Sequence, residues 1–243
     1  MSRDNGGTSL NRVGPLAWRS GTGWLMLAGG GAWRGGDMDD IHGAALGWAD
    51  LDRPLAVLPT AGGSPLEAEA LLEEFVDLGG PNGYVVPIFD AVGAQQLENC
   101  SLLEDAGLIV IDDGPHVVNL VRSLRASPAI DAMAQAFARG AVVLGLGAGA
   151  SALGEWVGDG ESSRDQAARA EPGFGWVANV IVAPHFGGIQ EDDRLRHLLN
   201  LKPNCLGLGV PDGTALSLGP SGEIENVGSG QVTIVVSGLE VEV

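Results

Sequence analysis

Two turns of this sequence carry residue types and spacings that could do chemistry. The first, residues 112–116 (DDGPH), follows the apolar run 106–111, and the second, residues 145–151 (GLGAGAS), follows the apolar run 141–144. In open α/β sheets, ligands bind beyond the carboxyl ends of the strands. Both turns are therefore candidates for a functional site.

The second turn has the layout of a nucleophile elbow. A strand, a sharp turn of small residues and then a helix place the turning residue in strained backbone, with its side chain presented above the sheet. The turning residue here is Gly147, which has no side chain to present. The pattern thus predicts the geometry of a nucleophile site without the nucleophile.

A third glycine-rich turn, residues 29–31, follows the first apolar run of the chain. It lacks the GxGxxG spacing, and no helix-like stretch opens directly after it, so the pattern does not favour a dinucleotide site. We interpret this turn as a tight exit from a strand.

The elements that must position these turns alternate along the chain. The helix expected at 64–78 has a clear start, since Ser64 and Glu67 form a capping box around Pro65. Apolar runs that are typical of buried strands alternate with helix-like stretches, as a parallel sheet covered on both faces requires. The strands are expected at 23–28, 54–59, 84–88, 106–111 and 141–145, and the other helices at 38–46, 117–124, 130–139 and 150–156.

The pattern changes after Trp176, where turns rich in Gly, Pro, Asp and Asn separate short strands. These strands predict an antiparallel edge on a mostly parallel sheet, and the polar stretch 158–171 is expected to be a loop. We predict a single α/β domain over residues 1–243, with residues 1–22 as an N-terminal extension and helices on both faces of a flavodoxin-like sheet. The late strands are expected at 180–183, 207–210, 215–218 and 231–236.

The composition limits the classes of partner. The 243 residues include 31 acidic and 13 basic side chains, a formal net charge of −18. This charge argues against nucleic acid and anionic membranes as partners because both select basic surfaces.

No apolar run approaches the roughly 18 residues that a membrane helix needs, and the N-terminus lacks the apolar core of a secretory signal, so we expect a cytoplasmic protein. Cys100 and Cys205 are too few for a disulfide framework and too isolated for a zinc site. We expect no metal and no cofactor, and a homodimer as the commonest homo-oligomer.

Several motifs, in the same order along the chain, resemble those of the S51 serine peptidases, the family of cyanophycinase and dipeptidase E. Residues 145–151 are similar to GTSAGAS, with Gly147 where the family has its serine, and residues 106–120 resemble a strand that ends in GGDQxxL or GGNTxxL. Residues 183–186 (APHF) resemble DQHF, and residues 207–215 (GLGVPDGTA) resemble GLGIDEGTA. The similarity extends over about residues 23–236.

This resemblance implies a fold related to class I glutamine amidotransferases and a Ser-His-acid site. In such a site the histidine takes the proton of the serine, and two backbone amides bind the oxyanion. His185 matches the histidine, while Gly114, Pro115 and Ala148 match the oxyanion hole. Pro115 has no backbone N–H, so the resemblance implies that one donor is missing.

Two further parts of the implied site are less sharply placed. His116 falls in the ligand-side loop, where the family has an acidic or amide residue. The acid partner of the histidine is expected between residues 155 and 161, and the candidates are Glu155, Asp159 and Glu161.

Glycine at position 147 has three interpretations: natural loss of the nucleophile, an engineered replacement of the serine, or a changed nucleophile. Natural loss is favoured because engineered knockouts normally use alanine. Ser151, one helical turn further along, is interpreted as a packing residue, with a replacement nucleophile as the alternative. His42 and His197 lie in polar, helix-like stretches and are interpreted as surface residues.

Two functions fit this pattern. A non-catalytic homologue would use the remaining cleft to bind a peptide-like or small acidic ligand, or a protein partner. An S51-type hydrolase would cut peptide or isopeptide bonds next to acidic residues with another nucleophile. The first is favoured, because removal of a triad serine from comparable enzymes leaves only residual activity. Glutamine amidotransfer would need a cysteine at the elbow, and neither cysteine lies there.

Overall fold

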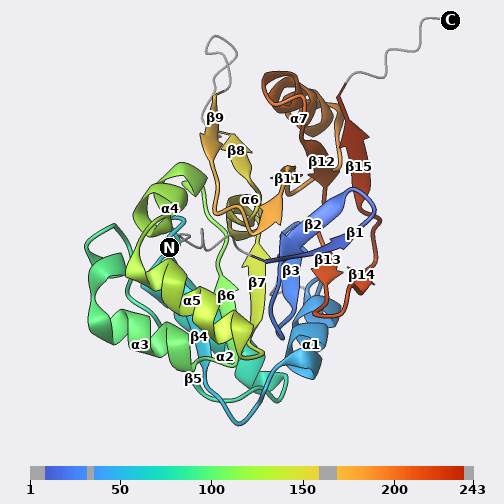
Figure 1. The fold of residues 1–243 in the computed structure, drawn as a ribbon. Coiled ribbons are helices and arrows are strands. Elements are labelled where there is room, and N and C mark those ends of the chain that lie inside the picture. Colours follow the sequence, from blue (N-terminus) through green and yellow to red (C-terminus); the bar gives the residue numbers. More distant parts are fainter. Residues whose placement is uncertain (1–8, 32–35, 159–168, 238–243) are drawn as a thin grey trace, which may run out of the picture.

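The computed structural model describes residues 9–31, 36–158 and 169–237, and a seven-stranded sheet lies at the centre of the fold (Figure 1). Its strand order is β14-β13-β3-β7-β6-β4-β5. The five strands β3, β7, β6, β4 and β5 are parallel to one another. At one edge β13 is antiparallel to β3, and β14 is antiparallel to β13. The strands are β3 (Leu25–Ala28), β4 (Leu55–Leu58), β5 (Gly83–Val85), β6 (Leu108–Ile111), β7 (Val142–Leu146), β13 (Thr214–Leu218) and β14 (Ile224–Gly228).

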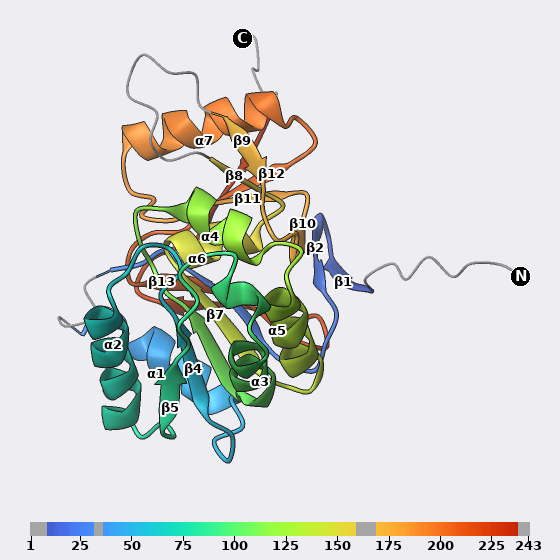
Figure 2. The same ribbon diagram turned by 90° about the vertical axis from the view of Figure 1, so that its left-hand side faces the viewer.

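Helices cover both faces of this sheet because its central strands are apolar on both sides. Along β3, Leu25 and Leu27 face one hydrophobic core, while Met26 and Ala28 face the other. Figure 2 shows α1 and α2 on one side of the strands and α3 and α5 on the other. The helices are α1 (Asp39–Trp48), α2 (Pro65–Asp77), α3 (Leu97–Asp105), α4 (Val117–Leu124), α5 (Pro128–Ala138) and α6 (Ala148–Leu153), with a 3₁₀ turn at Gly93–Gln95.

A second, five-stranded sheet stands next to the carboxyl ends of the central strands, with α7 (Ile189–Leu201) packed against it (Figure 1). Its order is β15-β12-β11-β8-β9, and Leu195 and Leu198 of α7 share a small core with Ile181 of β11. The strands are β8 (Trp156–Gly158), β9 (Ala170–Pro172), β11 (Val180–Ala183), β12 (Leu206–Gly209) and β15 (Thr233–Val236).

The N-terminal segment is part of the core. β1 (Leu10–Val13) and β2 (Leu16–Arg19) form a hairpin that pairs with β10 (Val177–Ala178). Trp18 of β2 is fully buried, and its indole N–H donates to the carbonyl of Gly219 at 3.2 Å.

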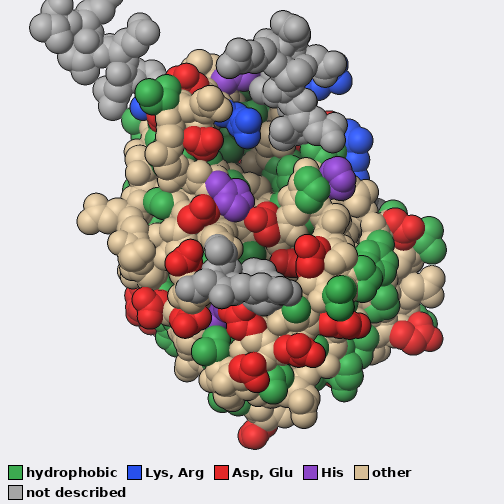
Figure 3. Space-filling model, turned by 180° about the vertical axis from the view of Figure 1, so that it is seen from behind, with side chains coloured by type: hydrophobic (Ala, Val, Ile, Leu, Met, Phe, Trp, Pro, Cys, Tyr) green, Lys and Arg blue, Asp and Glu red, His purple; other side chains and the backbone are tan. Residues whose placement is uncertain are grey.

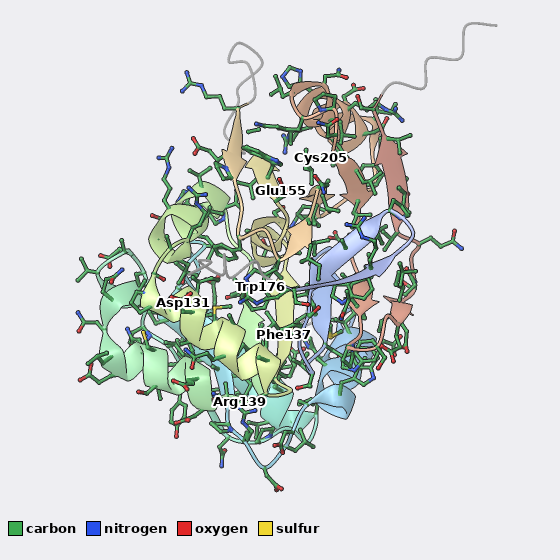
Figure 4. The ribbon with its side chains drawn as sticks, viewed as in Figure 1. Asp131, Phe137, Arg139, Glu155, Trp176 and Cys205 are labelled. Atoms are coloured by element: carbon green, nitrogen blue, oxygen red, sulfur yellow. The ribbon has the colours of Figure 1, made fainter. Side chains whose placement is uncertain are left out.

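The loop before β10 is also held by aromatic packing. Trp176 and Phe137 of α5 lie toward one another in Figure 4, with ring centroids 5.4 Å apart. This contact ties the strand next to the N-terminal hairpin to a helix of the central layer.

The α/β class and the mostly parallel sheet confirm the prediction from the sequence, and the capping box of Ser64 and Glu67 is present at the start of α2. Two details differ. The 180–183 and 207–210 strands were expected at an antiparallel edge, but β11 and β12 are parallel to one another in the second sheet. No helix within the described ranges is both long and apolar enough to cross a membrane.

Candidate active site

Four strand ends bring the candidate residues together. β6 and β7 are parallel neighbours with Ile111 beside Gly145, so the turns 112–116 and 145–151 leave the sheet side by side. β11 and β12 are parallel neighbours in the second sheet, with Ala183 beside Gly209, so the segments that follow them are also adjacent. Figure 2 shows α6, which follows β7, directly below the second sheet.

Gly147 is the turning residue between β7 and α6. Its backbone has φ 47° and ψ −108°, a conformation that residues with a Cβ rarely adopt. A Cβ at this position would lie 2.1 Å from Cγ of Asp113. The carboxylate of Asp113 therefore occupies the space into which a side chain at the elbow would project.

Two backbone amides hold the Asp113 carboxylate. Its Oδ1 accepts hydrogen bonds from the N–H of Gly114 at 2.7 Å and from the N–H of Ala148 at 2.8 Å. Two convergent backbone donors are the arrangement of an oxyanion hole. Gly114 and Ala148 supply both donors, so the proline at position 115 removes none of them, contrary to what the sequence comparison implied.

His185 lies between two carboxylates. Its Nε2 is 3.1 Å from Oδ2 of Asp113, and its Nδ1 is 2.7 Å from Oδ1 of Asp212. The side chains thus form a chain of contacts, Asp113–His185–Asp212. In a serine hydrolase the first place in such a chain belongs to the nucleophile and the last to the acid that orients the histidine.

The backbone of His185 is unusual. Its φ is 52°, in the left-handed region that residues other than glycine seldom occupy, and its N–H donates to the carbonyl of Gly29 at 2.9 Å. Such conformations cost about 1–3 kcal/mol and persist where the surroundings fix them, often at functional sites. The turn after β3 is what fixes this one.

The glycine-rich turn 29–31 also makes room for the imidazole. A Cβ at Gly30, where φ is 102°, would lie 2.3 Å from Cε1 of His185. The turn is therefore one wall of the site as well as the exit from a strand.

The carboxylate that contacts Nδ1 of His185 belongs to Asp212, a residue that the sequence analysis did not propose for this place. The Glu155 carboxylate instead accepts from the backbone N–H of Asn179 at 2.5 Å, and Figure 4 shows Glu155 next to β8. Asp159 and Glu161 lie outside the described residues. Asp212 takes the place because it follows β12, the parallel neighbour of the strand that leads to His185. The motif GLGVPDGTA, which carries aspartate where the family pattern has glutamate, was the available signal.

The charges of the three side chains support one another. The hydrogen bond that His185 donates to Asp113 is the main cause that raises the pKa of His185 to about 9; burial opposes it and the contact with Asp212 adds to it. Burial alone would raise the pKa of Asp113, but the hydrogen bonds from His185, Ala148 and Gly114 outweigh it and hold that pKa below the ordinary value. At neutral pH the site therefore holds an imidazolium between two carboxylates.

Asp112 next to this site behaves in the opposite way. Burial raises its pKa to about 6, although its carboxylate accepts a hydrogen bond from the backbone N–H of Asp113. Two adjacent aspartates thus differ because one is held by several donors and the other is mainly buried.

Other candidate residues are not members of this chain of contacts. His116 is exposed beside Gly62 at the start of α4, and the Ser151 hydroxyl donates to the carbonyl of Val182 at 2.9 Å. His197 is exposed on α7, whereas the interpretation of His42 as a surface residue is wrong, because this side chain is fully buried. His42 follows Met38 and precedes Ala45 on the face of α1 that packs on the sheet.

A cavity of about 290 Å³ opens at the site, between the turns of the central sheet and the second sheet. Asp113, His185 and Ser151 lie in its wall, and Glu191 and Arg194 of α7 contribute charges. The rest of the wall is largely apolar and includes Val117, Ile181, Val182, Pro184, Leu195 and Leu198.

Figure 3 shows this side of the molecule from behind, with acidic side chains gathered around histidines. Over the ranges that the structure describes, no group of three or more His, Cys, Asp or Glu side chains is arranged to hold a metal ion.

Known proteins resemble this chain in sequence. The chain is 27% identical over 213 residues to a cyanophycinase of Geminocystis herdmanii (strain PCC 6308), which covers 83% of this chain and 78% of that protein. It is 27% identical over 191 residues to a cyanophycinase of Synechococcus elongatus, which covers 76% of this chain and 59% of that protein.

A solved structure shares the fold. The crystal structure of a peptidase from an acI-B1 Actinobacterium superposes with a TM-score of 0.71 at 22% identity, over 90% of this chain and 97% of that one. The model of peptidase family S51 matches residues 25–222, a span that includes β3, both turns of the central sheet, His185 and Asp212. The chain therefore belongs to peptidase family S51.

Proposed function

We propose that this chain is an S51-family protein that does not hydrolyse peptide bonds by the serine mechanism and that uses its cavity to bind a small ligand. One observation carries this proposal. The carboxylate of Asp113 fills both the space of the elbow side chain at Gly147 and the pair of backbone donors that would hold an oxyanion.

Acyl transfer is opposed both by the filled space above Gly147 and by the filled pair of backbone donors. A serine mechanism needs a hydroxyl at the elbow and an empty pair of donors for the carbonyl oxygen of the substrate. The elbow has no hydroxyl, and the donors of Gly114 and Ala148 are already bonded to Oδ1 of Asp113. The complementary fit of Gly147 and Asp113 favours natural loss of the serine over an engineered change.

The cavity wall indicates what kind of ligand would bind. Its apolar side chains suit an uncharged hydrocarbon or peptide-like group, and a few polar groups at one end would orient it. Asp113, Asp212 and Glu191 outnumber the positive charges of His185 and Arg194 near this end. This balance favours a neutral or cationic ligand over the acidic ligand expected from the sequence.

The proposal is tested by reaction with a fluorophosphonate probe and by assays with aspartyl dipeptides, including β-linked aspartyl-arginine. We expect no covalent label and no hydrolysis, with an active cyanophycinase as the positive control. A label on Ser151 would contradict the proposal and establish a replacement nucleophile.

Ligand binding is tested separately by calorimetric titration with β-linked aspartyl-arginine, which carries no net charge. We expect measurable binding by the native chain and its loss in Val117→Trp, which fills the cavity with an indole. Binding that is unchanged in this variant would place the ligand elsewhere.

A further inference from the structure

We propose that Asp113 is a carboxylate nucleophile that forms an ester with a small alkyl substrate, and that His185 and Asp212 activate the water that hydrolyses this ester. This reaction goes beyond ligand binding. Aspartate and glutamate carboxylates are established nucleophiles in other enzymes, where the covalent intermediate divides one difficult step into two easier ones.

The two oxygens of Asp113 are already differentiated for this role. Oδ1 is bound by the N–H groups of Gly114 and Ala148, and Oδ2 faces His185 in the wall of the cavity. An ester formed through Oδ2 would leave Oδ1 as its carbonyl oxygen, held by two donors. Hydrolysis at Cγ then develops negative charge on the one atom that the site is built to stabilise.

The same arrangement selects the substrate class. An acyl substrate would need the donors that Oδ1 occupies, whereas attack on a saturated carbon develops no oxyanion on the substrate. The substrate is therefore an alkyl group with a leaving group. The apolar wall of the cavity and its volume of about 290 Å³ fit a short hydrocarbon chain.

The position of His185 limits which kinds of leaving group the reaction can have. Displacement at saturated carbon expels the leaving group on the side opposite the nucleophile, while His185 contacts the nucleophile itself. The leaving group must then depart as a stable anion without a proton from His185, as a halide does. Arg194 places a positive charge in the wall of the same cavity.

The reaction consists of ester formation followed by ester hydrolysis. A lone pair of Oδ2 forms the new bond to carbon as the carbon–halogen bond breaks, and halide leaves with the bonding pair. After the ester has formed, His185 releases its proton to the solvent and takes one from water, and the resulting hydroxide attacks Cγ of the ester. Collapse of the tetrahedral intermediate expels the alkoxide, which takes the proton from His185. The carboxylic acid left at Asp113 then returns its proton to His185, and the sum is alkyl halide plus water to alcohol, halide and a proton.

His185 is positively charged before the ester forms and can become uncharged afterwards, when a base is needed. In the resting site the Asp113 carboxylate is the main cause of the raised pKa of His185, with Asp212 as a second cause. Esterification neutralises Asp113 and removes that main cause, so His185 can release its proton and act as a base. Asp212 continues to hold Nδ1 and orients Nε2 toward the ester.

The experiment uses 1-bromobutane with an excess of the full chain in water enriched in the heavy oxygen isotope. We expect butanol and bromide as products and heavy oxygen in the carboxylate of Asp113, because the water oxygen enters at Cγ. Direct attack of water on the substrate would put the isotope in butanol and leave Asp113 unlabelled, which would overturn the inference.

Variants separate the two steps. In His185→Gln, ester hydrolysis should slow about 10²–10⁴-fold, the usual contribution of a general base, so a butyl adduct should accumulate on Asp113. Asp113→Asn should form no adduct, and Asp105→Asn, an exposed aspartate outside the cavity, should behave as the native chain. If His185→Gln does not fold, as judged by circular dichroism, the isotope result for the native chain decides alone.

The outcome also distinguishes this inference from the proposed function. Dipeptide binding without any alkylation of Asp113 would refute the nucleophile and leave the binding protein. Alkylation of Asp113 without dipeptide binding would support the nucleophile and refute that choice of ligand.

Discussion

Two histidine–carboxylate contacts of equal length hold imidazoles of different charge. Nδ1 of His42 lies 2.7 Å from Oε1 of Glu74, and Nδ1 of His185 lies 2.7 Å from Oδ1 of Asp212. Burial lowers the pKa of His42 to about 4, whereas the contacts of His185 raise its pKa to about 9. At neutral pH one imidazole is uncharged and the other is an imidazolium.

The surroundings explain the difference. The His42 side chain is fully buried between α1 and α2, and its one carboxylate partner, Glu74, has a pKa raised to about 7, first by burial and then by Asp39. The His185 side chain is 47% exposed and has Asp113 as a second carboxylate, itself fixed by two backbone N–H groups. A buried pair can avoid the cost of desolvation by becoming neutral, while a partly exposed pair with extra donors keeps its charges.

The largest expected effect comes from Gly147→Ala, which would displace the Asp113 carboxylate. His185 would then keep one carboxylate partner, as His42 has. The new Cβ would lie 2.1 Å from Cγ of Asp113, and the positive φ adds strain. We expect the free energy of unfolding to fall by about 3 kcal/mol, from strained backbone and lost hydrogen bonds to a charged group. Urea denaturation measures this change.

A matched control separates the clash from the general effect of the substitution. Gly43→Ala lies in α1, where a Cβ meets nothing within 4 Å, and it should stabilise the chain by about 0.5–1 kcal/mol. Adding Asp113→Gly to Gly147→Ala should recover part of the loss. If Gly147→Ala is as benign as the control, Asp113 does not occupy the elbow.

The second expected effect is on the pKa of His185 itself. In Asp113→Asn the main cause of the raised pKa is lost, so the pKa should fall from about 9 toward the ordinary value of about 6.5. Titration of the imidazole proton signals by NMR measures both histidines in one sample. The His42 imidazole should stay uncharged between pH 6 and 9 in either protein, and any change of its signals near pH 7 should follow the ionisation of Glu74 and vanish in Glu74→Gln. A midpoint in that range that persists in Glu74→Gln would contradict the uncharged imidazole.

The fold could be predicted from the sequence because its signals are local. The apolar runs, the capping box at Ser64 and the small-residue turn around Gly147 each specify their own conformation. The hairpin of β1 and β2 was missed because the burial of Trp18 depends on the distant Gly219 and on β10. Strands this short carry little signal of their own, and their pairing is decided by tertiary contacts.

The site was predictable where a motif fixes a position and not where two loops meet. His185 and Ala148 could be placed by motif. The space above Gly147 gave no sign of what fills it, although a close-packed protein does not leave such a space empty. Asp113 fills it only because β6 and β7 are adjacent. The burial of His42 could have been inferred from its spacing to Met38 and Ala45, three to four residues on either side.

The third expected effect is on the pH dependence of stability. The pKa of His185 is raised in the folded chain, so its stabilising contribution is complete below pH 6.5 and is lost as the pH rises through about 9. Solvent screening of this half-exposed group reduces the contribution to about 1 kcal/mol. The facing charged groups are Asp113 and Asp212 in contact, with Glu191 and Arg194 in the cavity wall.

Urea denaturation at pH 6.5 and pH 9.5 measures this loss against His185→Gln, which has no group to titrate there. The difference between the two proteins should shrink by about 1 kcal/mol at the higher pH. A difference that stays constant across this range would mean that His185 is not charged in the folded chain.

The smallest expected effect is that of Glu74→Gln, which tests the neutral pair directly. A protonated glutamate at position 74 can donate a hydrogen bond to Nδ1 of His42, and the amide of glutamine can donate to the same atom at nearly the same distance. The free energy of unfolding at pH 4.5 should therefore change by no more than about 0.5 kcal/mol, because at this pH Glu74 takes up little proton on folding and one neutral hydrogen bond replaces another. The matched change Asp212→Asn, at the same 2.7 Å distance from His185, should lower the pKa of that imidazole in an NMR titration because it removes a charge. A loss of several kcal/mol in Glu74→Gln would mean that the buried pair is ionised, since breaking a buried ion pair typically costs about 3–5 kcal/mol. The two histidine sites would then share one charge state, and burial would not be what separates them.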